Sequence, residues 1–234
     1  MYYRPKVSYI VTILCGIAAL AAFTVSTLHL DSRPIPNESI APTTSQNAPT
    51  KAVVALNELE VKGRAPKTYY SRDQFGSGWT SVRGCDTRNV ILQRDLTAIV
   101  KNEKCQVITG ILNDPYTGKA IEFQRGSDTS DAVQIDHVVP LSDAWQKGAQ
   151  LMSPERREAF ANDPLELLAV DGAANQQKSD SDAATWLPPN KAYRCTYVIR
   201  QIAVKKKYAL WVTDAEKAAI AAVLTTCPDI SLPE

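Results

Sequence analysis

The chain has 234 residues, with 26 Lys and Arg against 25 Asp and Glu and a formal net charge of +1. The part from residue 53 onward is long enough to bury the core of one domain. It holds 22 basic and 23 acidic residues, a net charge of −1, once the four cations and two acids before it are removed. This balance argues against a broadly basic nucleic-acid-binding surface, although a few placed cations are enough to hold phosphate.

An apolar segment without charged residues runs from Val7 to Leu30 and follows Arg4 and Lys6. It is long enough to span a bilayer as a helix, which predicts a signal anchor. A cleaved signal peptide is the alternative, because residues 19–21 (Ala-Leu-Ala) offer a small-x-small cleavage site. In both cases the rest of the chain lies outside the cytoplasm, either anchored to the membrane by this helix or secreted.

Residues 31–52 are rich in Pro, Ser and Thr and have almost no aliphatic pattern, which indicates a flexible linker. The chain is therefore divided into a signal anchor or signal peptide at 1–30, a linker at 31–52 and one domain at 53–234. We expect this domain to be monomeric and of the α+β class.

Hydrophobic periodicity and turn residues predict the elements of the first half of the domain. They are an amphipathic helix over 53–61, a Gly-rich aromatic stretch over 73–79, a helix over 90–97, and strands over 105–112 and 120–123. The two strands are joined by turn residues at 113–118, so a β-hairpin is expected.

The second half begins with a strand over 133–139 that Pro140 closes. The expected order after it is a helix capped by Ser142 through 146, a helix over 154–161 capped by Ser153, a strand over 165–170, a turn at 171–172, a helix over 173–178, and two helices over 190–207 and 213–226.

Four cysteines follow the apolar segment, and an even number in an exported domain indicates two disulfides. Their spacing lacks the close pairs of a structural zinc site. If the last two helices form an antiparallel hairpin, Cys195 and Cys227 lie at comparable distances from its turn. Pairing them leaves Cys85 with Cys105, the connectivity that we expect.

Candidate chemistry converges on His137, because the other histidine, His29, lies in the apolar segment. A general base near neutral pH is most often an imidazole, so His137 is the candidate. If the strands ending at His137 and Val170 pair, and the following helix packs across them, Asp136 and Asn175 come close to each other. Both offer the hard oxygen ligands that one Mg²⁺ or Mn²⁺ ion prefers.

Three stretches carry a family resemblance: residues 136–140 (DHVVP), 162–170 (NDPLELLAV) and 175–180 (NQQKSD). Together they resemble the HNH endonucleases, also called ββα-metal or His-Me finger nucleases. Residues 84–89 (GCDTRN), 114–118 (DPYTG) and 186–190 (WLPPN) resemble the exported branch related to the GmrSD-type restriction-enzyme C-terminal domain. The resemblance covers roughly residues 69–212.

The resemblance implies a ββα-metal finger embedded in a mostly helical domain with a β-hairpin. It implies His137 as general base, Asp136 and Asn175 as metal ligands, and Lys178 near the substrate phosphate. Arg125, shortly before the active strand, is a second candidate for phosphate binding by its position.

The chain departs from the family at the central asparagine, where Glu166 stands. Glu166 either bonds to loop amides or adds a carboxylate near the ion, and the sequence leaves both open. Asn162, four residues earlier, is another candidate for orienting the loop.

These residues predict an exported, metal-dependent endonuclease that hydrolyses DNA phosphodiester bonds with low sequence specificity, since no zinc finger or helix-turn-helix is added to read bases. RNA stays open as a substrate. One alternative is a catalytically inactive, surface-tethered module that binds nucleic acid or protein. Another is a disulfide-bonded structural domain of the cell envelope.

Overall fold

The computed structural model describes residues 50–227 and 231–233, so the predicted N-terminal helix over 1–30 and nearly all of the predicted linker lie outside the described residues. The α-helices within this part are α1 (Lys51–Glu58), α2 (Thr87–Asp95), α3 (Leu141–Gln146), α4 (Pro154–Ala161), α5 (Gly172–Lys178), α6 (Arg194–Tyr208) and α7 (Asp214–Leu224). Short 3-10 helices are η1 (Arg72–Phe75), η2 (Ser130–Ala132), η3 (Ala149–Leu151) and η4 (Lys191–Tyr193). None of the helices in the described ranges is both long and apolar enough to cross a membrane.

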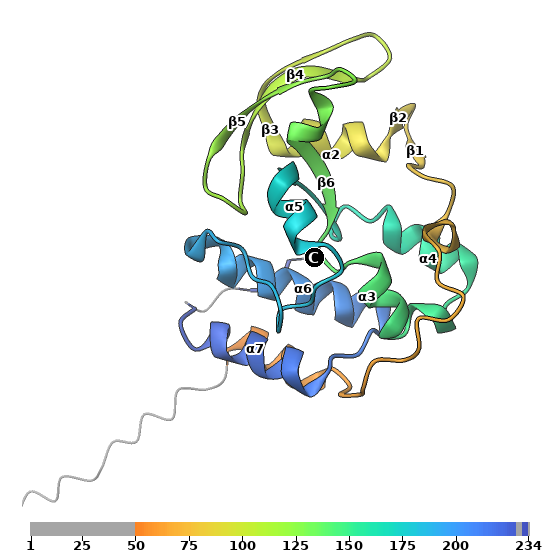
Figure 1. The fold of residues 1–234 in the computed structure, drawn as a ribbon, viewed down its shortest axis with the longest axis vertical. Helices are drawn as coiled ribbons and strands as arrows, with labels where there is room; N and C mark the ends of the chain where they lie inside the picture. Colours follow the sequence, from red (N-terminus) through yellow and green to blue (C-terminus); the bar gives the residue numbers. More distant parts are fainter. Residues whose placement is uncertain (1–49, 228–230, 234) are drawn as a thin grey trace, which may run out of the picture. The chain divides into compact units, whose positions relative to one another are not determined.

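The strands form three small antiparallel sheets. They are β1 (Ser81–Val82) with β2 (Cys85–Asp86), β3 (Leu96–Lys101) with β4 (Val107–Asn113) and β5 (Ala120–Gln124), and β6 (Val133–His137) with β7 (Leu167–Asp171). Figure 1 shows the three-stranded sheet beside α2 at one end of the domain, and α6 and α7 at the other. The β6–β7 pair and α5 lie between these two ends.

The predicted hairpin is confirmed, but it is part of a larger sheet. The expected helix over 90–97 begins earlier, at Thr87, because Asp86 caps it by accepting a 2.8 Å hydrogen bond from the Asn89 N–H. It also ends earlier, at Asp95, and Leu96 begins β3, which pairs with β4. The sequence prediction therefore extended this helix into the strand and missed β3.

One predicted cap is wrong, and one cap of the structure was not predicted. Ser142 does not cap α3, which begins at Leu141 directly after Pro140; the Ser142 hydroxyl instead donates to Asp180 at 3.1 Å. Asp171, expected in a turn, caps α5 by accepting from the Ala174 N–H at 2.7 Å. The predicted helix over 154–161 is confirmed, and its cap is Ser153 as expected.

Both predicted disulfides are confirmed. Cys85 pairs with Cys105 across a Cα–Cα distance of 5.5 Å, and Cys195 pairs with Cys227 across 5.6 Å. The second disulfide joins the start of α6 to the chain just after α7, as the helical-hairpin argument predicted. The first ties β2 to the turn before β4.

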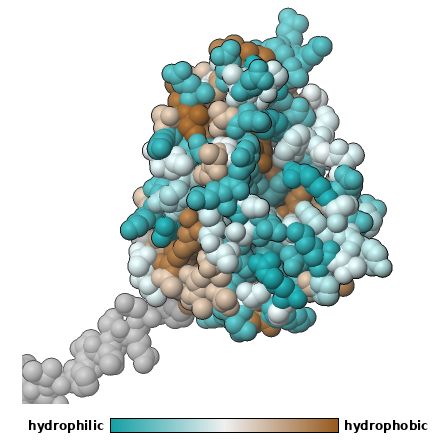
Figure 2. Space-filling model, viewed as in Figure 1, coloured by the Kyte–Doolittle hydropathy of each residue, from teal (hydrophilic) through white to brown (hydrophobic). Residues whose placement is uncertain are grey.

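Three apolar clusters form the core. One lies where α1, α6 and α7 pack together, a second lies around α3 and α4, and a third lies between α2, the three-stranded sheet and the β6–β7 pair. Figure 2 shows that hydrophilic side chains cover most of one face, with apolar residues in separate patches. The β6–β7 pair contributes residues to the first and third clusters, so core packing holds it on both sides.

Candidate functional site

The site is built on β6, β7 and α5. β6 and β7 pair in register, with His137 opposite Leu167 and Val133 opposite Asp171. Helix α5 packs against both strands. Pro140 cannot donate a ladder hydrogen bond, which suits the end of β6 just before it. Successive side chains of a strand point to opposite faces, so Asp136 faces α5 while His137 faces the end of α4.

His137 is held by a backbone carbonyl. Its Nε2 lies 3.0 Å from the carbonyl oxygen of Ala161, the last residue of α4. A carbonyl can only accept, so Nε2 carries the proton and Nδ1 is left as a proton acceptor. Burial lowers the pKa of His137 to about 3, and the positive charge of Arg72 acts in the same direction. The ring is therefore neutral near pH 7 and has a free lone pair on Nδ1, although the same burial makes it a weaker base than a solvated imidazole.

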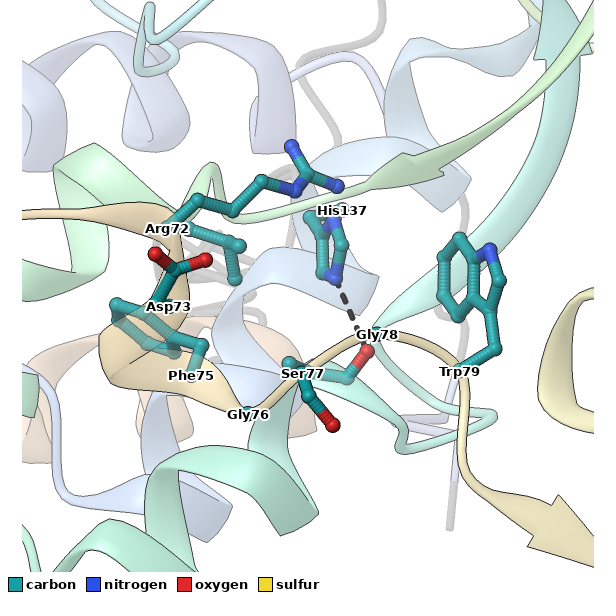
Figure 3. Close-up of a pocket in the computed structure, with 10 residues that line it drawn as sticks. Arg72, Asp73, Phe75, Gly76, Ser77, Gly78, Trp79 and His137 are labelled. Carbon is teal, nitrogen blue, oxygen red and sulfur yellow. Dashed lines mark hydrogen bonds between the residues drawn. The ribbon is translucent and has the colours of Figure 1, made fainter.

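A cavity of about 180 Å³ opens beside His137, walled by the Gly-rich stretch. The indole of Trp79 lies nearly parallel to the imidazole, with an angle of 7° between the planes and 6.0 Å between ring centroids. Figure 3 shows Trp79 on one side of the imidazole, and the guanidinium of Arg72 near the edge of the ring that lies away from the dashed hydrogen bond. We name this space the Trp79 cavity; Arg72, Asp73, Phe75, Gly76, Ser77, Gly78, Leu141 and Ala161 line it together with Trp79 and His137.

A larger cavity of about 690 Å³ meets the first one at His137. Asp136 and Asn175, the two predicted metal ligands, line it together with His137. Three cationic side chains, Lys67, Arg72 and Arg88, also line it. The structure thus brings the predicted base and both predicted ligands to one cavity that is large enough for a phosphodiester group and several waters.

Asp136 is almost entirely buried, and both of its oxygens already accept hydrogen bonds. Oδ1 accepts from the Lys178 ammonium at 2.9 Å, and Oδ2 accepts from the Tyr116 hydroxyl. Burial raises the pKa of this carboxyl, and Lys178 and Tyr116 oppose the rise. A carboxylate has about four lone-pair sites, so each oxygen keeps capacity for one further partner.

Asn175 is oriented by a side-chain hydrogen bond. Its Nδ2 donates to Gln134 Oε1 at 2.9 Å. Because the amide nitrogen is engaged there, Oδ1 is the atom left to accept or to ligate. One carboxylate and one amide oxygen, completed by water and phosphate, suit Mg²⁺, so the donor set fits a single ion. Among residues 50–227 and 231–233, no group of three or more His, Cys, Asp and Glu is close enough to hold a metal.

Two predicted phosphate contacts have other partners. Lys178 is fully buried, and its ammonium donates to Asp136 and, at 2.8 Å, to the His137 carbonyl. Lys178 therefore holds the end of β6 in place, whereas it was expected to reach into the cavity. Arg125 donates to the Val107 carbonyl at 2.7 Å and to Asn89 Oδ1 at 2.6 Å, so it links β5 to β4 and α2 and lines neither cavity.

Glu166 takes the first of its two predicted roles. It is fully buried, and its two carboxyl oxygens lie 3.0 and 3.2 Å from the Val139 nitrogen, whose N–H donates to them. Its own carbonyl accepts from the Val138 N–H at 2.9 Å. Burial raises the Glu166 pKa well above its ordinary value. Glu166 therefore holds the loop that directly follows His137.

Asn162 orients a different segment from the predicted one. Its Oδ1 accepts from the Thr80 N–H at 2.9 Å, and its Nδ2 lies 3.4 Å from the Gly78 carbonyl. The side chain thus bonds to the backbone on both sides of Trp79. The neighbouring residue Ala161 holds His137, so the end of α4 positions both rings.

Sequence reasoning missed several groups of the site. Arg72 directly precedes the Gly-rich aromatic stretch over 73–79, which ends at Trp79 and was noted without a role. The Ala161 carbonyl has no side-chain signature at all. Arg88 was not missed entirely, because its position near Cys85 suits either a phosphate contact or an ion pair beside the disulfide. It donates to the Val133 carbonyl at 3.2 Å and lines the larger cavity. Burial lowers the Arg88 pKa, and the charge of Arg125 adds to this effect.

Comparison with known proteins agrees with the resemblance noted in the sequence. The family model of the GmrSD restriction endonucleases, C-terminal domain, matches residues 86–223, a range that includes β6, β7 and α5. An uncharacterized secreted protein of Arthroderma benhamiae is 37% identical over 211 residues, which cover 89% of this chain and 98% of that protein. Since the matched range spans more than half of the chain, the protein belongs to the family of GmrSD restriction endonuclease C-terminal domains, and this indicates a nuclease-related function.

Proposed function

We propose that the protein is an exported, metal-dependent endonuclease of the HNH type that hydrolyses DNA phosphodiester bonds with low sequence specificity. The observation that carries this proposal is the neutral His137 ring, held at Nε2 by the Ala161 carbonyl, in a cavity shared with Asp136 and Asn175. In this proposal β6, β7 and α5 are the ββα-metal finger.

His137 acts as the general base. Its Nδ1 accepts the proton of a water molecule that attacks the phosphorus atom, and the ring becomes an imidazolium. The Ala161 carbonyl, which already accepts the Nε2 proton, stabilises that cation. The bond between phosphorus and the 3′ oxygen breaks, the leaving oxygen takes a proton from solvent water, and the imidazolium later returns its proton to solvent.

Asp136 and Asn175 would hold one divalent ion, Mg²⁺ or Mn²⁺. When bound, such an ion stabilises negative charge on the phosphate and on the leaving oxygen. The chain prepares these ligands through other residues: Gln134 fixes the Asn175 amide, and Lys178 favours the ionised form of Asp136 against its burial. Arg72 and Arg88 line the same cavity and supply positive charge for the phosphate.

Export is supported by two disulfides in the domain and by a relative whose name describes it as secreted. The apolar N-terminal segment serves export as either an anchor or a cleaved signal. The domain acts outside the cytoplasm, where it meets extracellular DNA.

The test is cleavage of supercoiled plasmid by the oxidised protein with Mg²⁺, with Mn²⁺ or with EDTA. His137→Ala is expected to lower the rate by about 10²–10⁴-fold, the usual contribution of a positioned general base. Circular dichroism of the variant must match the wild type. Nicking that persists in EDTA or in the folded variant would refute the proposed mechanism.

A second candidate is a catalytically inactive module that binds nucleic acid or protein. The two hydrogen bonds that Asp136 accepts from Lys178 and Tyr116 favour it, because a buried carboxylate with one partner on each oxygen resembles a structural element more than an open ligand. This alternative predicts that the folded protein binds DNA in a mobility-shift assay and forms no cleavage product with Mg²⁺ or Mn²⁺.

A further inference from the structure

Trp79 is fixed in place beside the proposed base. Asn162 bonds to the backbone at Gly78 and Thr80, the residues on either side of it. The Thr80 carbonyl in turn accepts from the N–H and the hydroxyl of Thr87 at the start of α2. Trp79 itself is half-buried, with part of its indole packed against the third core cluster. It is therefore a rigid aromatic wall and not a surface side chain free to rotate.

The Trp79 cavity has the size and position of a subsite next to the scissile bond. Its volume of about 180 Å³ far exceeds the ~10–15 Å³ that a single water needs. It opens to solvent along Ser77 and Gly78, which are exposed, and it joins the larger cavity at His137. A group in this cavity can therefore belong to the nucleotide chain whose phosphate lies at His137.

We propose that the Trp79 cavity is a nucleobase subsite, in which an unpaired base next to the scissile phosphate stacks on the indole of Trp79. The proposal rests on the proposed nuclease function and names its preferred substrate class: single-stranded or locally unpaired nucleic acid. Residues 72–79 precede the range matched by the family model, so family membership does not assign this subsite.

A base is the occupant that the lining favours. One wall of the cavity is the indole of Trp79, and every nucleobase has a π-face that stacks on such a side chain without sequence preference. Two polar groups also line the cavity, the Ser77 hydroxyl and the Asp73 carboxylate, and they suit the hydrogen-bonding edge of a base. A base within a duplex cannot enter, because it is stacked and paired, and extruding it costs a few kcal/mol.

The competing explanation is that Trp79 only shields His137 from water and so keeps the imidazole neutral. A shield predicts that loss of the indole changes the pH dependence of cleavage for all substrates equally. A subsite predicts that it changes the preference between substrates that differ only in one base.

The test uses thymidine oligonucleotides with a single hydrolysable phosphodiester among non-hydrolysable linkages. In each substrate, the nucleotide on the 5′ side or on the 3′ side of the hydrolysable phosphodiester either bears thymine or is abasic. The measured quantity is the ratio of kcat/KM for the base-bearing substrate to that for the abasic one. We expect the wild type to favour the base by about 5- to 100-fold at one of the two positions, as for the loss of one stacked base.

Trp79→Ala is expected to bring this ratio close to one, while Trp79→Phe, which keeps a ring, retains most of it. Tyr69→Ala is the matched control, because Tyr69 is 86% exposed, lines neither cavity and leaves the ratio unchanged. Near-UV circular dichroism establishes that each variant is folded.

An active wild type that cleaves both substrates equally would overturn the subsite and leave the nuclease proposal intact. The subsite is also overturned if Trp79→Ala slows both substrates equally and preserves their ratio, which is the result that a shield predicts. A folded wild type that cleaves neither substrate with Mg²⁺ or Mn²⁺ would instead refute the nuclease function itself.

Discussion

Replacement of Glu166 tests whether a buried acid has taken over the task of orienting the loop after His137. In Glu166→Ala, the Val139 N–H loses its acceptor while it stays buried. An unsatisfied buried donor costs about 1–3 kcal/mol, and the lost methylene adds about 0.8 kcal/mol of burial. The free energy of unfolding should therefore fall by about 2–4 kcal/mol. Urea unfolding of the oxidised protein, followed by tryptophan fluorescence, measures this difference.

Glu166→Gln is the matched control, since its amide oxygen can still accept from the Val139 N–H. We expect this variant to retain most of the stability and most of the activity, whereas the alanine variant loses both. If Glu166→Ala unfolds within about 0.5 kcal/mol of the wild type, the hydrogen bond to Val139 does not hold the loop.

The pH dependence of the same pair of proteins has a defined sign. Burial raises the Glu166 pKa in the folded protein, and Asp136 adds to this, whereas the Val139 N–H and Lys178 oppose it. The unfolded chain ionises near pH 4.5, so above that pH unfolding releases a proton. The stabilisation is fully present below pH 4.5 and is lost as pH rises through the folded pKa. Because Gln does not titrate, the wild type should lose stability relative to Glu166→Gln between pH 5 and pH 8, and a constant difference would contradict the assignment.

Three further outcomes are expected. Lys147→Met should lower the free energy of unfolding by about 3–5 kcal/mol. The buried Lys147 ammonium lies 2.6–2.7 Å from Asp143, Asp182 and Glu216, and these three carboxylates would lose this partner. A urea midpoint like that of the wild type would contradict this. Replacing Cys195 and Cys227 with serine should cost about 2–4 kcal/mol in the same assay, and an unchanged midpoint would show that the α6–α7 packing suffices without the disulfide. Burial lowers the pKa of His137 to about 3, so protonation of the imidazole should not limit the cleavage rate between pH 5 and 8. A rate that falls tenfold per pH unit from pH 7 to 5 would show that the imidazole is more exposed than the fold implies.

The parts of the fold that could be predicted were those written in local sequence. Ser153 and Pro154 mark the start of α4, Pro140 marks the end of β6, and the cysteine spacing fixed both disulfides once a helical hairpin was assumed. β3 was missed because residues 96–101 are a strand only through their pairing with β4. Without that partner, their sequence fits a further turn of α2 equally well. Strand pairing is a tertiary property, and a short apolar run fits either structure.

The site was predictable in its composition but not in its contacts. His137, Asp136 and Asn175 were chosen by residue type and spacing, and they do line one cavity. The partners of Asp136 come from α5 and from the turn before β5, so no local pattern announces them. Lys178 is the clearest example of a contact that the sequence did not predict. Its position on the helix predicted a contact with substrate, whereas its buried ammonium donates to the His137 carbonyl on β6.

The segment between β6 and β7 connects these observations. It contains α3 and α4, and two consecutive residues at the end of α4 act on the two rings of the site: the Ala161 carbonyl sets the tautomer of His137, and the Asn162 side chain fixes the backbone around Trp79. A shift of this helix end would move the base and the aromatic wall together. The helical insertion therefore fixes the spacing between the group that activates water and the ring proposed to bind the adjacent base, which a bare strand pair and helix could not do.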